Sequence, residues 1–184
     1  MADYEAIDPA VEVHGQTIRT VIEDALARFS TEYQELAREA LAKNGVEDPS
    51  PDEWYPQQAW LNTFETLAAE TEPHILDRLG EQIPDVVEWP TGVSSVEAGL
   101  AAIDEAYQLN HRGSDEIGSY RFESVDERTA RMTCKNPYPC PFDRGLIRAV
   151  ARRNAPVESF VFVEERGDEC RRTGGDRCTY TVSW

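Results

Sequence analysis

The chain has 184 residues, of which 35 are acidic and 18 are lysine or arginine, and its formal net charge is -17. This length suits a single domain with a real hydrophobic core over residues 1–184. The negative charge argues against nucleic acid or an anionic membrane as a partner, because it repels phosphate. Lysine occurs only at Lys43 and Lys135, and an acidic, lysine-poor composition is typical of halophilic proteins, whose repulsion salt screens.

The sequence gives no sign of a membrane segment or a secretory signal. No run of about 18 apolar residues is present, which is the length that a transmembrane helix needs. The N-terminal residues MADYEAIDPAVEVHG lack a basic stretch followed by an apolar one. We therefore expect a cytoplasmic location, where cysteines are more often thiols or metal ligands than disulfides.

The first part of the chain has a helical pattern. Residues 1–13 show no clear period, so we expect a loose lead-in there. Residues 14–113 carry amphipathic stripes, beginning with apolar residues at steps of three and four between Gly15 and Phe29. Ser30 and Thr31 then offer an N-cap for a second helix, and Thr31-Glu-Tyr-Gln34 fits a capping box.

The rest of this helical part alternates with proline-rich loops. Residues 46–56 contain three prolines and predict a loop. A third helix follows, and then a short fourth helix that Pro73 opens and Gly80 is expected to end. Residues 81–93 predict a second loop, after which the capping box Ser94-Ser-Val-Glu97 starts a fifth helix.

From residue 114 onward the hydrophobic period changes to that of β-strands. Tyr120 and Phe122 alternate with charged residues, and a second alternating run ends at Cys134, which predicts a β-hairpin. A helix is expected from about Asp143, where apolar residues again recur at helical spacing.

Two further strands complete the predicted fold. Val157–Val163 has two apolar sides, so we expect it at the centre of a sheet. Residues 177–184 alternate again and form the last strand. The predicted fold class is α+β, with N-terminal helices packed on an antiparallel sheet that a C-terminal β-β-α-β-β unit (residues 114–184) forms.

All four cysteines of the chain lie between Cys134 and Cys178, in two turn-rich segments. Zinc prefers thiolate ligands and takes four ligands in structural sites. The residues alone leave several alternatives: a structural metal site, which we favour, reduced cysteines in the core, or a disulfide such as Cys170 with Cys178. A catalytic thiol is not favoured, because the sequence places no histidine beside a cysteine as a base.

The sequence around these cysteines resembles the 4-vinyl-reductase domain family. The shared features are Cys140-Pro-Phe-Asp-Arg-Gly145 before a helix and a Cys-x7-Cys pair, Cys170 and Cys178, before an apolar strand. The opening His14-Gly-x-x-Ile-x-x-Val-Ile-x-x-Ala-Leu26 is similar to the start of haem nitric-oxide-binding (H-NOX) domains and their haem-free relatives. The ending GGDRCTYTVSW is similar to a bacterial and archaeal group of this length, so we identify a haloarchaeal-type member.

This resemblance implies the H-NOX-like ligand-binding fold, with a pocket between helices and sheet. In sensor members a small hydrophobic or aromatic molecule binds there, homodimers are common, and the output is often a signalling or transcription domain. Because no output domain follows in this sequence, we expect a separate signalling or transcription partner.

The resemblance also implies zinc held by three cysteines and a glutamate. Cys140, Cys170 and Cys178 match the family positions, but Gly167 stands where the family has its glutamate. Glu164 or Glu165 could serve if the turn holds two extra residues, and Glu169 sits adjacent to Cys170. Cys134 could replace the carboxylate as a fourth thiol.

Haem is not expected as a cofactor. H-NOX domains ligate iron with a histidine after the central helices, which His111 resembles, and hold the propionates with Tyr-x-Ser-x-Arg, which Tyr120-Arg-Phe-Glu-Ser does not reproduce. Aromatic side chains at helical spacing are more often core residues than ligand contacts. With that reservation, the candidate pocket residues are Trp60, Phe64, Tyr107, His111, Tyr120 and Phe122.

We therefore predict a sensory or regulatory domain that takes a small apolar or aromatic ligand, with a structural zinc near the C-terminal cysteines. The main alternative is a structural or dimerisation module without a ligand. A haem gas sensor or a reductase is less favoured, because no nucleotide motif or catalytic constellation is present. An apolar cavity of about 300 Å³ or more would favour sensing, and a solid core would favour assembly.

Overall fold

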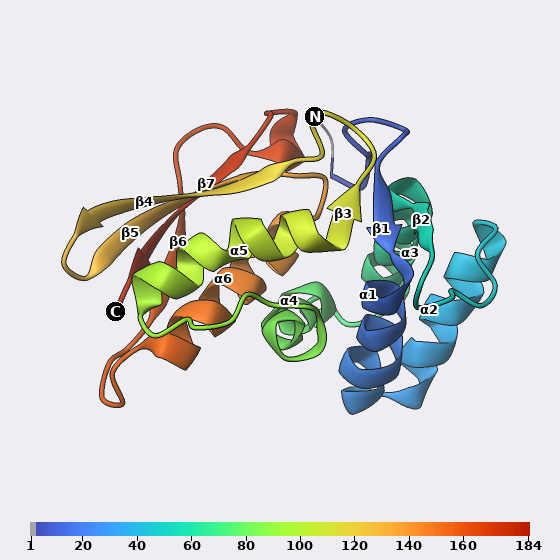
Figure 1. The fold of residues 1–184 in the computed structure, drawn as a ribbon, viewed down its shortest axis with the longest axis horizontal. Helices are drawn as coiled ribbons and strands as arrows, with labels where there is room; N and C mark the ends of the chain where they lie inside the picture. Colours follow the sequence, from blue (N-terminus) through green and yellow to red (C-terminus); the bar gives the residue numbers. More distant parts are fainter. Residues whose placement is uncertain (1–2) are drawn as a thin grey trace.

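The helices of the first part pack beside an antiparallel sheet formed by the second part (Figure 1). The computed structural model describes residues 3–184. The first part contains β1 (Glu12–His14), α1 (Gly15–Thr20), a π-helical turn η1 (Val21–Ala25), a 3-10 turn η2 (Leu26–Arg28), α2 (Thr31–Lys43), β2 (Trp54–Pro56), α3 (Gln57–Glu70), α4 (Ile75–Val86), α5 (Val96–Asn110) and β3 (His111–Arg112). The second part contains β4 (Ser119–Asp126), β5 (Thr129–Lys135), α6 (Cys140–Asn154), β6 (Phe162–Arg166), a 3-10 turn η3 (Arg171–Thr173) and β7 (Cys178–Ser183).

The main sheet has the strand order β4-β5-β7-β6, and neighbouring strands are antiparallel. This confirms the predicted α+β class with a C-terminal β-β-α-β-β unit. Helices α5 and α6 lie along one face of the sheet, and α4 packs on α6 (Figure 1). The helices thus leave the other sheet face uncovered, so buried residues of β5 and β7 alternate with residues that are half-buried or, at Arg131, exposed.

The expected loose lead-in is partly structured. Met1 and Ala2 lie outside the described residues, but Val13 is fully buried within β1. β1 pairs with both β2 and β3 in a small sheet, so the predicted loop over residues 46–56 also ends in a strand, at Trp54–Pro56. Short strands of this kind carry too few residues to show an alternating pattern.

Helix α4 continues past the predicted stop at Gly80 and ends at Val86. Gly80 serves a close approach between helices: a Cβ there would lie 2.2 Å from the Phe142 carbonyl oxygen. On α6, a Cβ on Gly145 would lie 1.9 Å from the Asp77 carbonyl oxygen. The glycines therefore allow α4 and α6 to touch along their backbones, and the predicted loop over residues 81–93 is correspondingly shorter.

Helix starts differ slightly from the predicted capping boxes. Ser30, not Thr31, caps α2, because its hydroxyl accepts from the Glu32 N–H at 3.1 Å. Helix α6 starts at Cys140 rather than near Asp143. The Phe142 N–H donates to the Pro139 carbonyl at 2.9 Å, so the first turn is already helical. Pro141 is tolerated in this turn because its missing N–H would have had no helical partner.

Strand β6 was expected at the centre of the sheet but lies at its edge. β6 pairs only with β7, whereas β7 pairs with both β5 and β6. The predicted strand Val157–Val163 is also misplaced, because β6 begins only at Phe162 and both Val157 and Phe160 lie in the loop before it. The three side chains face water: the exposed fractions of Val157, Phe160 and Phe162 are 103%, 80% and 60%. A run with two apolar sides predicted burial on both faces, and this exposure contradicts that prediction.

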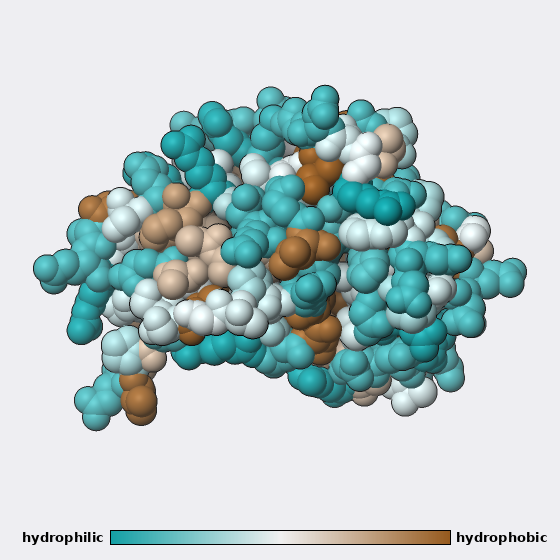
Figure 2. All heavy atoms as spheres, viewed as in Figure 1, coloured by the Kyte–Doolittle hydropathy of each residue, from teal (hydrophilic) through white to brown (hydrophobic). Residues whose placement is uncertain are grey.

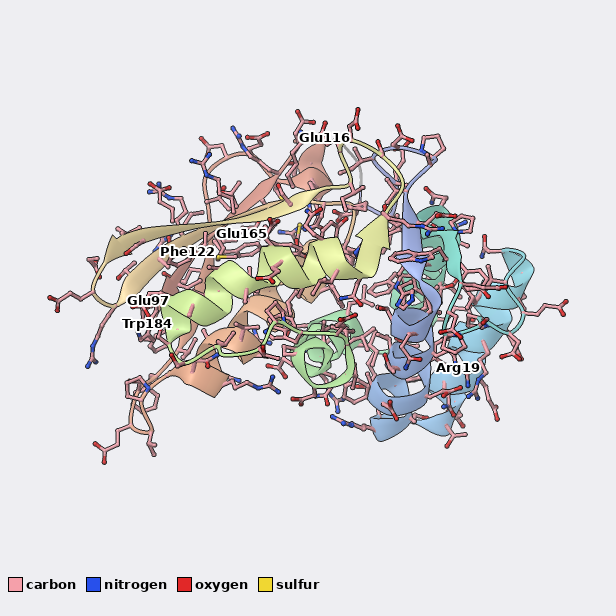
Figure 3. All side chains as sticks on the ribbon, in the orientation of Figure 1. Arg19, Glu97, Glu116, Phe122, Glu165 and Trp184 are labelled. Atoms are coloured by element: carbon pink, nitrogen blue, oxygen red, sulfur yellow. The ribbon has the colours of Figure 1, made fainter. Side chains whose placement is uncertain are left out.

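The face shown in Figure 2 is mostly hydrophilic, with hydrophobic residues in the projecting loop between α6 and β6 and in small groups near the middle of the face. Charged side chains stand outward from the helices and from the outer sheet face, where Arg131 pairs with Glu123 at 3.0 Å (Figure 3). Among residues 3–184, no helix has the length and apolar character needed to span a bilayer.

Candidate functional site

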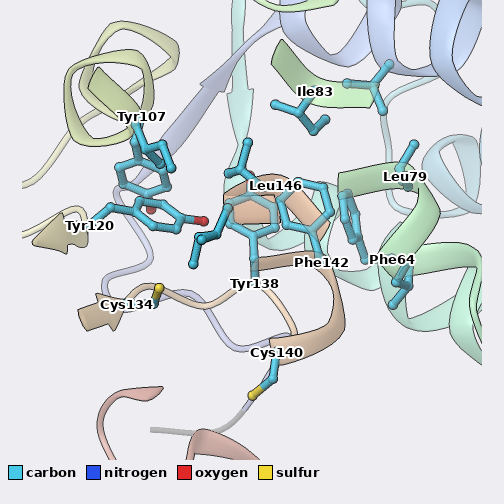
Figure 4. Close-up of a cluster of buried hydrophobic side chains, with 14 of the residues drawn as sticks. Phe64, Leu79, Ile83, Tyr107, Tyr120, Cys134, Tyr138, Cys140, Phe142 and Leu146 are labelled. Atoms are coloured by element: carbon cyan, nitrogen blue, oxygen red, sulfur yellow. The ribbon is translucent and has the colours of Figure 1, made fainter. Parts of the chain in front are cut away.

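An aromatic cluster occupies the space between the helices and the sheet (Figure 4). Phe64 of α3 stands edge-on to Trp60, Phe142 and Tyr138, with ring centroids 5.1, 5.1 and 5.3 Å apart. Tyr107 of α5 stacks on His111 with ring centroids 4.0 Å apart. Such geometries add to the burial of apolar area, so this cluster is a rigid part of the core.

A cavity of about 60 Å³ lies within this cluster. Its walls come from the helical part, α6 and β4: Thr17, Val21, Trp60, Phe64, Ile83, Val87, Trp89, Ile103, Ala106, Tyr107, Asn110, His111, Tyr120, Tyr138, Phe142 and Leu146. The volume exceeds what one water needs but is well below the roughly 300–1,000 Å³ of pockets for drug-sized ligands. The cavity therefore holds a molecule of a few heavy atoms while the side chains keep these positions.

Five of the six residues expected in the pocket line this cavity: Trp60, Phe64, Tyr107, His111 and Tyr120. Phe122 does not line it; it is partly buried between the sheet and α5 (Figure 3). Tyr138 and Phe142, which follow β5, were missed at this site. Tyr138 lies in a proline-rich turn, where no period shows which way a side chain points.

His111 is a titratable residue of the cavity wall. Its Nδ1 lies 2.8 Å from the Tyr107 carbonyl oxygen and its Nε2 lies 2.8 Å from the Tyr138 hydroxyl. A carbonyl only accepts, so Nδ1 carries the proton and Nε2 accepts from Tyr138. Burial lowers the pKa of His111 to about 4, despite the opposing effect of the Tyr107 carbonyl. The imidazole is therefore neutral in the folded protein near pH 7.

Three cysteines meet at the start of α6. The Sγ of Cys140 lies 3.0 Å from that of Cys178 and 3.4 Å from that of Cys170, and the latter two are 3.5 Å apart. All three are buried and none forms a disulfide. Cys140 comes from the helix start, Cys170 from the loop before η3 and Cys178 from β7. Three converging thiols offer three of the four ligands of a tetrahedral zinc site.

The surroundings of the cluster favour a thiolate at Cys178. The pKa of Cys178 is lowered to about 5 by the hydrogen bond from the Cys140 thiol, helped by the Arg171 N–H and by the Arg171 charge. The pKa of Cys140 is raised by the same hydrogen bond and by burial. Burial also raises the pKa of Cys170, and Glu165 adds to this effect. A lowered thiol pKa eases metal binding, because the ligand must be deprotonated.

Several residues are candidates for the fourth ligand of a zinc ion at this cluster. Neither Cys134 nor Glu165 belongs to the group whose ligand atoms all lie within 4.8 Å of one another. Cys134 stands apart from Cys140 (Figure 4), and Glu165 accepts from Arg172 at 2.8 Å. Asp3, which the sequence did not indicate, has a buried carboxylate oxygen without a hydrogen-bond partner. The pKa of Cys140 is raised most by the Cys178 hydrogen bond, next by burial and then by the Asp3 charge, so this carboxylate lies near the thiols.

A buried ion pair lies beside the thiols. The side chains of Arg171 and Asp143 are both inaccessible to solvent, and a guanidinium Nη2 of Arg171 donates to Asp143 Oδ2. Asp143 Oδ1 accepts from the Tyr120 hydroxyl at 2.6 Å. A charged pair in the interior needs such partners, because each ion has lost its hydration. The partnering is incomplete at the Arg171 Nε, which lies 3.9 Å from Asp3 Oδ1 and has no hydrogen-bond partner among the described residues.

Comparison with known proteins shows the fold. No protein-family model and no curated protein matches the sequence. Solved structures of H-NOX domains do match: one from S. oneidensis is 14% identical with a TM-score of 0.63, covering 92% of this chain and 95% of that chain. One from T. Tengcongensis is 15% identical with a TM-score of 0.64, and one from K. algicida is 12% identical with a TM-score of 0.65; they cover 92% of this chain and 96% and 95% of theirs. The chain has the H-NOX fold.

Proposed function

We propose that this protein binds a small apolar molecule between its helices and its sheet and acts as a sensory domain. The observation that carries the proposal is the apolar cavity lined by Trp60, Phe64, Tyr107 and Tyr120 within an H-NOX fold. The resemblance to 4-vinyl-reductase domains supports a haem-free sensor. At about 60 Å³ the cavity suits a ligand of a few heavy atoms, and an aromatic ligand requires side chains to move aside.

Haem does not fit the residues at this site. Two of the similar solved structures come from studies of haem distortion, so the fold accommodates a porphyrin in those proteins. Here both ring nitrogens of His111 are engaged, which leaves none for iron. Phe64, Tyr138 and Phe142 contact one another in the middle of the cluster, and the remaining volume is far too small for a macrocycle.

A structural or assembly module is the second candidate. The cavity is smaller than the few hundred cubic ångströms expected for a typical ligand pocket, and this specific observation favours it. Xenon distinguishes the two candidates, because dry apolar cavities take up xenon whereas solid cores do not.

We expect xenon to bind in the cavity of the wild-type protein. Under xenon pressure, NMR signals of Trp60 and Tyr107 should shift in a saturable way, and Ala106→Leu should abolish the shifts because Ala106 lines the cavity. Ala101→Leu is the matched control, since Ala101 is exposed on the same helix. Absence of saturable shifts in the folded wild type would contradict ligand binding in this space.

We further propose that Cys140, Cys170 and Cys178 hold a structural zinc, with Glu165, Asp3 or Cys134 as candidates for the remaining position. Zinc there would supply a fixed link between the start of α6, the loop before η3 and β7. The convergence of three buried thiols supports this proposal over scattered reduced cysteines.

Metal analysis tests the zinc site. Purified protein should contain about one zinc per chain. Loss of a residue that only hydrogen-bonds to a metal ligand lowers metal affinity roughly tenfold to hundredfold. Cys178→Ser removes a ligand itself, so it should lower zinc affinity by more than that. Cys134→Ser is the matched control if Cys134 is not a ligand, and retained affinity there would settle that question. Four titratable free thiols with no bound metal in the wild type would contradict the proposal.

The partners and the cellular setting also remain proposals. A homodimer and a separate signalling or transcription partner follow from the resemblance, and exposed Val157, Phe160 and Phe162 offer an apolar surface beside the β6 edge. A cytoplasmic, halophilic setting fits the net charge of -17.

A further inference from the structure

Arg171 lies between the three thiols and the aromatic cavity. It follows Cys170 directly, and its side chain is inaccessible to solvent. Its backbone N–H donates to the Cys178 sulfur at 3.4 Å. The position of this residue therefore depends on how the loop that carries Cys170 is held against Cys178.

The guanidinium reaches the cavity wall by two routes. In the first, Nη2 donates to Asp143, and the other oxygen of Asp143 accepts from the Tyr120 hydroxyl at 2.6 Å. In the second, Nη1 donates to the side-chain oxygen of Asn136 at 2.7 Å, and the same oxygen accepts from the Tyr138 N–H at 2.9 Å. Tyr120 and Tyr138 both line the cavity.

The loop that carries Arg171 is anchored mainly by its inward side chains. Residues 166–169 and 172–173 are exposed, while Cys170 and Arg171 are buried. The loop's own turn is closed by hydrogen bonds such as that from the Gly175 N–H to the Cys170 carbonyl at 2.9 Å. The thiol contacts of Cys170 thus act on the same short turn that places the guanidinium.

We propose that Arg171 is a positioning residue that couples occupancy of the thiol site to the shape of the cavity. The inference rests on the proposed metal site. Holding Cys170 beside Cys140 and Cys178 keeps the guanidinium between Asp143 and Asn136, which in turn fixes two tyrosines of the cavity wall. By linkage, the coupling is reciprocal: a change at the cavity end alters affinity at the thiol end.

Zinc affinity of cavity variants tests the coupling without a known ligand. Tyr120→Phe removes only the hydroxyl that donates a hydrogen bond to Asp143. This hydroxyl does not touch the cysteines through a hydrogen bond, so the change leaves the thiols themselves intact. We expect Tyr120→Phe to weaken zinc binding on the order of tenfold, measured by competition with a chromophoric chelator. Asp143→Asn, which keeps an acceptor for Tyr120 but removes the charge facing Arg171, should weaken it as well.

Tyr55→Phe is the matched control, because it also removes one tyrosine hydroxyl but lies outside the cavity wall, where that hydroxyl donates to Glu53 and accepts from the Ser50 N–H. Its zinc affinity should stay within about twofold of wild type, below typical coupling factors. Wild-type affinity in Tyr120→Phe, or equal weakening in Tyr55→Phe, would overturn the coupling while leaving the zinc site intact. A wild type that binds no zinc would instead overturn the metal site and the coupling together.

Discussion

Replacing Asp143 with alanine should lower the free energy of unfolding by about 3–5 kcal/mol, because it removes the carboxylate that accepts directly from the buried Arg171 guanidinium and leaves the more distant Asp3 carboxylate, 3.9 Å from Nε. Both side chains are inaccessible to solvent, so water cannot take the place of the lost carboxylate. The change also removes the acceptor of the Tyr120 hydroxyl. Urea denaturation of the two proteins at neutral pH measures the difference.

Two comparison variants show whether burial is the cause. Glu123→Ala removes the partner of Arg131 on the sheet surface, where both side chains are about half exposed, and should cost less than about 1 kcal/mol. The double variant Asp143→Leu/Arg171→Met removes both charges and should be more stable than Asp143→Ala alone. If Asp143→Ala unfolds at the wild-type urea concentration, the pair is not a major source of stability.

The sequence predicted most of the helices and the main sheet because each of these segments is long enough to show several repeats of its hydrophobic period. It failed where a local signal had a tertiary cause. Gly80 resembles a helix stop, but its missing side chain lets α4 touch the backbone of α6, and that contact lies across a long sequence separation. Phe160 and Phe162 resemble part of a buried strand, but Phe160 lies in the loop before β6, and Phe162 begins β6 at the sheet edge, which only the strand order reveals.

The candidate site was predictable in part for a similar reason. The spacing of Cys170 and Cys178 predicted the thiol cluster. The aromatic residues on helical stripes predicted much of the cavity wall. The sequence places Arg171 in a polar turn and does not predict its burial, because its partners Asp143 and Asn136 lie 28 and 35 positions away. No pattern in the sequence distinguishes a buried arginine in a turn from a solvated one, because burial depends on these distant partners.

His111 should make the free energy of unfolding depend strongly on pH. Its pKa falls from 6.5 to about 4 on folding, because burial disfavours the charged ring. The unfolded chain therefore binds more protons between these values, and the free energy of unfolding rises with pH across this window. The contribution is fully present above pH 6.5 and is lost as the pH falls toward 4, amounting to about 3 kcal/mol for a shift of this size.

The neighbours of His111 leave no easy way to accept a second ring proton. Protonation would add a proton at Nε2, which now accepts from Tyr138, whose pKa burial raises well above its usual value. His111→Gln should therefore flatten the curve of unfolding free energy between about pH 6.5 and 4. Carboxylates titrate in both proteins, so the difference between the curves isolates His111. Parallel wild-type and His111→Gln curves would mean that the imidazole is protonated in the folded state, which would contradict the hydrogen bonds assigned to it in the cavity wall.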